Sequence, residues 1–398
     1  MNVLISGVGI AGPTLAFWLR KYGFAPTLVE SAPALRTSGY VIDFWGLGYD
    51  IAEKMGLLPD IARIGYHMQE LRIVDDCGRR LSGFGVQVFR QLTGGRYITL
   101  GRSDLSKLIY DRISRSCEII FGDSITSLRQ AHGEVHVEFE HGAKRRFDLV
   151  IGADGLHSRV RKLVFGPQDR YETELAYRVA AFETGGYRPR NELVYTIHCA
   201  PGRQVGRFAL HNDRTLFLFI FDSGGEPEAH VVGAQKAILR KAFEGDGWEL
   251  PRILAALDTC NDLYFDRVSQ IRMDAWSQGH VALVGDAGFR VSLLAGQGSA
   301  LAMTAAYVLA GELATSQDRP QEAFRRYEGA PPGRAGPPPA EHRPGPLRLP
   351  DRRLRGRIRS RGASPLSHDL SPRSRYAGSA RPASSRSGKR GHRHRLPA

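Results

Sequence analysis

Three glycines near the start of the chain have the spacing of a pyrophosphate-binding turn. Gly7, Gly9 and Gly12 follow the apolar run VLIS in the order G-x-G-x-x-G, and an amphipathic segment follows them. The first glycine permits a sharp turn, the second lets a pyrophosphate approach the backbone, and the third lets a helix pack against the strand. Glu30 lies at the end of the next apolar run, where a carboxylate accepts hydrogen bonds from a ribose diol. The pattern predicts a dinucleotide site; the alternative is a plain glycine turn in another α/β unit.

Two later motifs place an acidic residue and a glycine directly after a predicted strand. Asp154 and Gly155 follow FDLVIG, and Asp286 follows Gly285 after HVALV. A carboxylate at the carboxyl end of a strand is well placed to bind hydroxyl groups at the edge of a sheet. The stretch 296–298, Gly-Gln-Gly, precedes a helix rich in small residues, so its backbone N–H groups would face an anion. For Asp286 the alternative is that it only caps its own turn.

The elements that must position these motifs are alternating strands and helices. We expect an α/β fold with a Rossmann-like, three-layer domain formed by residues 1–70, 100–175 and 271–330. The β-rich ranges 71–99 and 176–270 are expected to form a smaller sheet-based domain. The two domains interleave along the chain because the last predicted strand must join the N-terminal sheet. A ligand pocket between them is the default expectation.

Composition is typical of a globular protein without a disulfide framework. The hydrophobic fraction is 42%, and four cysteines are scattered without a C-x-x-C pair, which suggests reduced thiols and a cytoplasmic location. No apolar run is long enough to span a membrane, and the 13 histidines show no metal-ligand spacing. The formal net charge of +14 lies entirely in residues 331–398, which contain 17 basic and three acidic residues. The preceding 330 residues are therefore formally neutral, and no nucleic-acid partner is expected for the folded part.

These motifs, taken in order, resemble the single-component FAD-dependent aromatic hydroxylases of the para-hydroxybenzoate hydroxylase type, the group A flavoprotein monooxygenases. Within that group the chain is most similar to the tetracycline-inactivating and polyketide-tailoring enzymes, over about residues 1–328. The resemblance implies FAD as the cofactor and NADPH or NADH as a transient electron donor. The residues that it assigns to cofactor binding are Gly7, Gly9, Ile10, Ala11, Gly12, Glu30, Arg36, Asp43, Arg102, Asp154, Gly155, Gly285, Asp286, Gly296, Gln297 and Gly298.

The resemblance also distributes roles along the FAD. Glu30 would bind the adenosine ribose, so the glycine fingerprint would hold FAD and not the nicotinamide donor. Arg36 would lie near the pyrophosphate or the donor, and Arg102 at the ribityl side of the flavin. Asp286 would bind a ribityl hydroxyl, and Asp43 matches a position near the isoalloxazine.

The second motif is implied to serve both FAD and NADPH. Ser158 and Arg161 complete the motif that begins with Asp154 and Gly155. The chain has a single G-x-G-x-x-G, so NADPH would have no Rossmann site of its own and would bind transiently in a groove. The family commonly has a proline next to the reactive edge of the flavin, between the Gly-Asp motif and the glycine loop; this chain has Ser292 in that stretch.

The chemistry implied by the resemblance belongs to the cofactor. NAD(P)H reduces the flavin, dioxygen adds at flavin C4a, and the resulting hydroperoxide transfers an oxygen atom to an electron-rich carbon of an aromatic or polyketide-like substrate. Neither a catalytic side chain nor a metal is required. The alternatives are a related flavin oxidoreductase that does not hydroxylate, and an inactive FAD-binding remnant or basic-tailed binding protein.

Substrate contacts are expected on one face of the alternating strands in 176–222. The candidates are Arg207, Phe208, His211, Phe219 and Phe221. Ordinary sheet packing or a solvated turn is the alternative for each of them, because buried strands are commonly rich in aromatic residues.

The last part of the chain, residues 331–398, changes character. It is rich in Pro, Arg, Gly and Ser and contains 12 of the 22 prolines, so we expect it to be disordered. The composition favours an out-of-frame reading of a GC-rich gene; the alternative is a basic arm that binds nucleic acid or an acidic membrane. The resemblance implies a long C-terminal helix that braces the two domains; EAFRRYEGA starts like this helix, and the pattern then stops.

Overall fold

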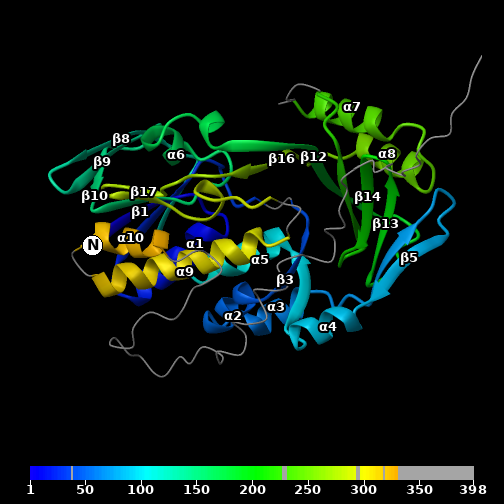
Figure 1. The fold of residues 1–398 in the computed structure, drawn as a ribbon, viewed down its shortest axis with the longest axis horizontal. Coiled ribbons are helices and arrows are strands. Elements are labelled where there is room, and N and C mark those ends of the chain that lie inside the picture. The colour runs from blue at the N-terminus through cyan, green and yellow to red at the C-terminus, as the bar shows by residue number, and fades with distance from the viewer. Residues whose placement is uncertain (37–38, 226–230, 293–295, 317–318, 330–398) are drawn as a thin grey trace, which may run out of the picture.

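A mainly parallel sheet, built from separate parts of the chain, forms the centre of the larger half of the molecule (Figure 1). The structure is a computed structural model, and it describes residues 1–36, 39–225, 231–292, 296–316 and 319–329. The strand order is β17-β18-β11-β1-β2-β7. These strands are β1 (Asn2–Ser6), β2 (Ala25–Glu30), β7 (Glu118–Phe121), β11 (Leu149–Gly152), β17 (Ser277–Gln278) and β18 (Val281–Leu283).

The strand order reverses beside β1. The chain leaves β1 through α1 (Ala11–Lys21) to reach β2 on one side, whereas β11 pairs with β1 on the other side, parallel to it. The register pairs Ser6 with Gly152 and Gly152 with Leu283, so three strands end at the same edge. Open α/β sheets bind ligands outside the carboxyl ends of the strands at such a switch point.

Alternate residues of these buried strands serve two separate cores. Val3, Ile5 and Ile151 pack against helices, while Leu4 and Val150 pack on the opposite face. The helices of this half are α1, α2 (Leu47–Lys54), α3 (Leu58–Ile64), α5 (Arg102–Asp111), α6 (Arg159–Val164), α9 (Gly298–Ser316) and α10 (Pro320–Gly329). Except for α6, whose Val160 lies in the opposite core, residues from each of them lie in the first core.

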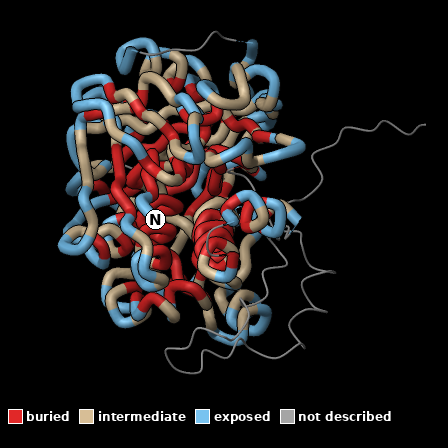
Figure 2. The backbone as a smooth tube through the Cα atoms, turned by 90° about the vertical axis from the view of Figure 1, so that its left-hand side faces the viewer, coloured by how far each residue is buried: buried red, intermediate tan, exposed pale blue. Residues whose placement is uncertain are grey.

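The opposite face of the central sheet is covered by a small antiparallel sheet. Its strands, in the order β10-β9-β8, are β8 (Ile125–Ala131), β9 (Glu134–Phe139) and β10 (Arg145–Phe147). Val135, Val137 and Phe147 join Leu4 and Val150 in one buried cluster. The larger half therefore has three layers, and Figure 2 shows its buried segments enclosed between exposed loops. The expected α/β fold with a three-layer, Rossmann-like domain is confirmed.

A seven-stranded sheet forms the other half, in the order β16-β12-β15-β14-β13-β4-β5. All neighbouring strands are antiparallel except β13 and β4, which are parallel. Two helices, α7 (Val232–Phe243) and α8 (Leu250–Asp258), cover one face. The strands are β4 (Glu70–Val74), β5 (Arg80–Gly85), β12 (Glu172–Gly185), β13 (Val194–Ala200), β14 (Arg203–Ala209), β15 (Arg214–Asp222) and β16 (Tyr264–Ile271).

A two-stranded ribbon joins the two halves. It consists of β3 (Val41–Trp45) and β6 (Tyr97–Gly101), which pair antiparallel. The third strand along the chain therefore lies outside the central sheet, and Figure 1 shows it between the halves. Tyr66 and Phe208 pack beside Tyr40 and Val41 in one cluster at this junction. The remaining elements are α4 (Gln87–Thr93), η1 (Gln168–Arg170) and η2 (Gly285–Ala287).

The helix expected near EAFRRYEGA begins at Pro320 and is described to Gly329; residues 331–398 lie outside the described part. The Tyr327 hydroxyl donates to the Leu283 carbonyl at 3.1 Å, and Glu328 accepts from the Trp276 N–H at 2.6 Å. These bonds fasten α10 to β18 and to the residue before β17, and Arg326 of α10 pairs with Glu312 of α9 at 2.7 Å. Within the described ranges, no helix has the length and apolarity needed to cross a membrane.

Replacing Phe324 by Ala tests how far α10 stabilises this half. Phe324 is 1% exposed in the main core, so we expect Phe324→Ala to lower the free energy of unfolding by about 3–5 kcal/mol. Arg325→Ala, at an exposed position of the same helix, should change it by no more than about 0.5 kcal/mol. Urea unfolding followed by circular dichroism measures both values, and equal effects would contradict an anchoring role for α10.

Candidate cofactor and substrate site

The three glycines of the first motif have different surroundings in the structure. Gly7 has a φ of +107°, and a Cβ there would lie 2.5 Å from the Ala153 carbonyl oxygen. A Cβ on Gly12 would overlap the Gly7 carbonyl oxygen. A Cβ on Gly9, in contrast, would meet no heavy atom within 4 Å. Gly7 and Gly12 are therefore required by the fold, while Gly9 leaves space at the start of α1, where a helix favours phosphate.

Glu30 is fixed against the glycine turn. At the end of β2, its Oε2 accepts the Val8 N–H at 2.9 Å and its Oε1 accepts the Ala32 N–H at 3.0 Å. The Ser31 hydroxyl also donates to Oε1, at 3.3 Å, so the acceptor capacity that is left is mainly on Oε2. The side chain that is predicted to hold the ribose is thus positioned by the same loop that is predicted to hold the pyrophosphate.

The Asp154 carboxylate is held by hydrogen bonds at the start of α6. It accepts the N–H groups of Arg159 and Val160, at 2.9 and 3.1 Å, and also the Ser158 hydroxyl. Burial raises the pKa of Asp154, and these hydrogen bonds oppose the rise. A Cβ on the next residue, Gly155, would meet nothing within 4 Å. At this motif the backbone of Gly155 borders open space, while the Asp154 carboxylate fixes the turn.

Arg161 connects the second motif to the third. It is fully buried, and its guanidinium donates to the Ala287 carbonyl at 2.9 Å and to the Leu156 carbonyl. Sequence reasoning placed Arg161 in the motif without this contact. The turn after β11 and the turn after β18 are thus held together by one buried cation.

The third motif lies where α1 and α9 meet. A Cβ on Gly285 would lie 3.3 Å from the Ala11 Cβ and 3.4 Å from the Ala302 Cβ, so the turn after β18 is packed between the two helices. The Asp286 carboxylate is 36% exposed, and its Oδ2 lies 3.9 Å from the Arg290 Nε. Unlike Asp154, Asp286 keeps accessible oxygens for a hydroxyl-bearing ligand.

The segment before α9 has unusual backbone conformations. Gly296 has a φ of +65°, and Gln297 accepts the Leu301 N–H through its carbonyl at 2.9 Å. Gly298 is the first residue of α9. Ser292 has a φ of +113°, a region that L-residues rarely adopt, and it is nearly buried. Residues 293–295 lie outside the described part.

Asp43 belongs to a buried polar group in the joining ribbon. Its Oδ1 accepts the Tyr97 and Thr99 hydroxyls, each at 2.7 Å. Burial raises the pKa of Asp43 above its ordinary value of 3.8, and the two hydrogen bonds oppose this rise. Sequence reasoning missed both hydroxyls. The available signal was their alternation on β6, which the register places opposite Asp43.

The two predicted cofactor arginines lie in different environments. Arg36 is exposed on the loop after β2, directly before two residues that are not described. Arg102 begins α5 and is half-buried, and its backbone N–H donates to the Tyr40 carbonyl at 3.0 Å. Its charge lies close enough to Tyr40 to oppose the rise in the Tyr40 pKa that burial causes.

The structure separates the predicted substrate residues and corrects the idea that they share one face. Phe219 and Phe221 are buried beneath α7 and α8, and Arg207 pairs across the sheet with Phe217 of the same core. Phe208 lies on the opposite face, in the cluster with Tyr66. His211 is exposed at the edge of that face, where its ring stacks on Tyr66 with centroids 4.4 Å apart. Alternation alone did not show which face a second layer covers.

A charged group that sequence reasoning missed lies beside the third motif. The Arg290 guanidinium is 8% exposed and lies 3.9 Å from both the Asp286 and the Asp266 carboxylates. Asp266 Oδ1 is also 3.6 Å from His157 Nε2, and Asp266 raises the His157 pKa. These contacts link β16 to the turns after β11 and β18.

The comparisons with known proteins agree on one family. A family model described as an FAD binding domain matches residues 1–329. The uncharacterized protein Rv1260 of Mycobacterium tuberculosis is 39% identical over 338 residues, which cover 82% of this chain and 88% of that protein. A flavin-dependent monooxygenase from an unknown prokaryotic organism is 36% identical over 330 residues, covering 82% and 84%. The crystal structure of tetracycline destructase Tet(51) has a TM-score of 0.74 at 33% identity, covering 83% of this chain and 86% of that one.

Substituting the glycines one at a time separates binding from folding. A methyl group on Gly9 would enter only open space, so Gly9→Ala should fold normally but bind FAD at least about tenfold more weakly. Gly12→Ala should lose folded protein, because its Cβ would overlap the Gly7 carbonyl oxygen. Flavin fluorescence titration of the apoprotein and its thermal unfolding measure the two effects. Undiminished FAD affinity in Gly9→Ala would contradict this placement of the pyrophosphate.

The buried Asp43 gives a pH-dependent prediction. Because its pKa is raised in the folded state, its contribution to stability is present below the ordinary value of 3.8 and is lost as the pH rises through the folded-state pKa. Asp43→Asn removes this loss and keeps an acceptor oxygen for Tyr97 and Thr99. Its stability relative to the parent should increase as the pH rises from the acid range to neutrality.

Urea unfolding of apoprotein at a series of pH values measures this difference. Asp111→Asn, on an exposed position of α5, is the control and should stay close to the parent throughout. If the difference in free energy of unfolding between Asp43→Asn and the parent does not change with pH, the Asp43 carboxylate is as well stabilised in the folded protein as in the unfolded one.

Proposed function

The chain belongs to the FAD-binding-domain family of group A flavoprotein monooxygenases, and on that premise we propose that it uses NAD(P)H and dioxygen to hydroxylate a small aromatic or polyketide-like molecule. In the balanced reaction NAD(P)H, a proton, dioxygen and a C–H bond of the substrate give NAD(P)⁺, water and a C–OH bond. FAD, when bound, supplies the electron transfer and the activation of dioxygen. The protein supplies binding, orientation and electrostatics.

The observation that carries the proposal is the convergence of three turns at one sheet edge. The strands β1, β11 and β18 end in register, and the turns that follow them lie beside the starts of α1 and α9. Space is open at Gly9 and Gly155, and the Glu30 and Asp286 carboxylates keep acceptor capacity for hydroxyls. Backbone N–H groups for phosphates and carboxylates for sugar hydroxyls fit a flavin dinucleotide. A start of α9 that faces the flavin would stabilise its anionic reduced form.

The face of the seven-stranded sheet beside the joining ribbon supports the proposal of an aromatic substrate. Phe208, Leu216 and Tyr66 form an apolar cluster on the face of the seven-stranded sheet opposite α7 and α8. Tyr195 packs edge-on against Phe208, with ring centroids 6.0 Å apart. A planar, electron-rich molecule fits aromatic walls of this kind. The name of the neighbour Tet(51) gives tetracycline as its substrate, and this supports a polyketide-like molecule here.

The electron donor is proposed to bind without a second nucleotide-binding fold. The sequence contains one G-x-G-x-x-G. The turn that it forms is assigned to the FAD pyrophosphate and is therefore not free for the electron donor. Transient binding near the turn after β11, beside His157 and Gly155, agrees with the family pattern for this motif. The sequence motif does not distinguish NADH from NADPH, because Glu30 is assigned to the FAD ribose.

Coupled turnover tests the proposal. Purified protein loaded with FAD should oxidise NADPH or NADH faster when a suitable phenol or tetracycline is added, and mass spectrometry should find one labelled oxygen atom in the product under isotopically labelled dioxygen. Asp286→Ala, which removes a proposed ribityl contact, should show weaker FAD binding and slower turnover. If every compound tested only increases hydrogen peroxide release, without a labelled product, the hydroxylase assignment fails and a non-hydroxylating flavin oxidase remains.

A further inference from the structure

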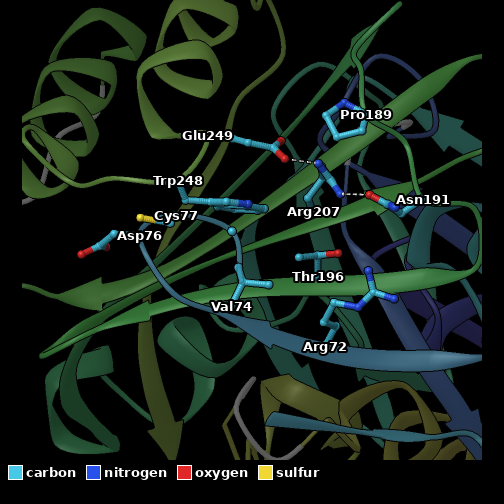
Figure 3. A pocket seen from close by; sticks show the side chains of 11 residues that line it. Arg72, Val74, Asp76, Cys77, Pro189, Asn191, Thr196, Arg207, Trp248 and Glu249 are labelled. Carbon is cyan, nitrogen blue, oxygen red and sulfur yellow. Dashed lines mark hydrogen bonds and ion pairs between the residues drawn. The ribbon is translucent and has the colours of Figure 1, made fainter. Parts of the chain in front are cut away.

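A polar cavity lies on the face of the seven-stranded sheet that α7 and α8 cover (Figure 3). It has a volume of about 380 Å³, which is in the range of small-molecule sites. Its floor is formed by one row of cross-strand neighbours, in which Arg72 pairs with Thr196 and Thr196 with Arg207. Arg207 pairs in turn with Phe217 of the core beneath α7 and α8. The cavity is thus on the helix-covered face, whereas the proposed substrate face is the opposite one.

The floor contains buried polar atoms without partners. Thr196 is 3% exposed and Arg207 is 2% exposed. Among the described residues, neither the Thr196 hydroxyl nor the Arg207 Nε has a hydrogen-bond partner. Buried polar atoms are nearly always hydrogen-bonded, and leaving one unpaired costs about 1–3 kcal/mol. Both residues line the cavity, so a ligand bound there is one way to complete these atoms.

The two arginines of the cavity are each paired with a carboxylate, whereas Asp76, which also lines it, contacts His198. The Arg207 guanidinium binds Glu249 and Asn191, and Glu249 also accepts the Tyr187 hydroxyl at 2.9 Å. Figure 3 shows the pairing of Arg207 with Glu249 and Asn191 above Thr196. Both oxygens of Glu249 are therefore engaged, and Arg207 brings no net charge to the cavity.

Arg72 is the cation that remains accessible at the rim. Its Nε and one terminal nitrogen donate to Glu70 at 3.1 and 2.7 Å, and the other terminal nitrogen keeps two N–H groups. Together with Arg207 Nε and the Thr196 hydroxyl, the hydrogen-bonding groups that remain unpaired are mainly donors. A ligand must therefore present acceptors, and with each arginine already paired to a carboxylate it should carry no more than one negative charge.

Trp248 supplies an aromatic wall in a strained conformation. Its φ is +54°, which is rare for a bulky residue. Its backbone N–H donates to the Asp76 carbonyl oxygen at 2.5 Å. The indole lies over the Arg207 guanidinium at 5.5 Å and stacks with His198 at 5.9 Å. His198 in turn contacts Asp76 Oδ1 at 2.8 Å. These contacts pre-position a flat apolar surface beside the donors.

We infer that this cavity is a second ligand site, which binds a small planar aromatic carboxylate. The carboxylate meets Arg72 and the Thr196 and Arg207 donors, and the ring lies along Trp248. A phosphate dianion fits less well, because it would bring two negative charges to arginines that are already paired with Glu70 and Glu249. The site is independent of the proposed hydroxylation and of the residues assigned to FAD.

Binding of para-fluorobenzoate to the full-length, FAD-loaded protein tests the inference. Fluorine NMR should show saturable binding, tryptophan fluorescence should be quenched, and the flavin absorbance should not change. Trp248→Phe should remove the quenching. Arg72→Gln should weaken binding about tenfold, as expected for loss of one charge-assisted hydrogen bond. Thr196→Val should also weaken it.

Arg80→Gln is the matched control. Arg80 also contacts Glu70, at 3.4 Å, but it does not line the cavity, so its loss should leave the affinity unchanged. Urea unfolding of each variant checks that the fold is intact, and uncharged fluorobenzamide should bind more weakly than the acid. The inference is overturned by absence of saturable binding, by equal affinity in Arg72→Gln and Thr196→Val, or by binding that occurs only with a change in flavin absorbance.

Discussion

The close approach of backbone atoms where α1 begins is the constraint on which the rest of the site depends. The start of α1 can lie against the end of β1 only because residue 12 has no side chain, and the end of β11 can lie against the first turn only because residue 7 has none. Once these contacts are made, the carboxyl ends of neighbouring strands are in register. Glu30, Gly155 and Asp286 then lie around one edge, although they come from distant parts of the chain. The proposed cofactor site therefore depends on the register of the sheet.

The junction between the two halves adds a second layer of organisation. The ribbon of β3 and β6 carries the buried Asp43 group, and the apolar cluster around Tyr66 and Phe208 lies beside it. Arg290 links Asp266 of β16 with Asp286 of the turn after β18, so charge as well as packing connects the halves. A substrate held between an aromatic sheet face and the flavin edge would be shielded from water, as hydroxylation requires.

Local structure could be predicted from the sequence where spacing alone determines it. The glycine turn, Glu30 and Asp286 follow from short motifs beside apolar strands, and the α/β fold follows from their order. The partners of Asp43 could not be found, because they depend on the pairing of β3 with β6 across 54 residues. The environment of Arg207 was hidden for a similar reason: period-two alternation shows that a strand has two faces, but the helices that cover one face come later in the chain. The parallel pairing of β13 with β4 likewise has no local signal.

Ligands are proposed on both faces of the seven-stranded sheet, and neighbouring residues of one strand contribute to each face. Tyr195 and Phe208 belong to one face, and Thr196 and Arg207 belong to the other. During evolution, point substitutions can therefore adjust either face while leaving the other intact. Insertion or deletion of a single residue within β13 or β14 would exchange the faces for the rest of the strand. Purifying selection on the lengths of these two strands should accordingly be stricter than selection on their composition.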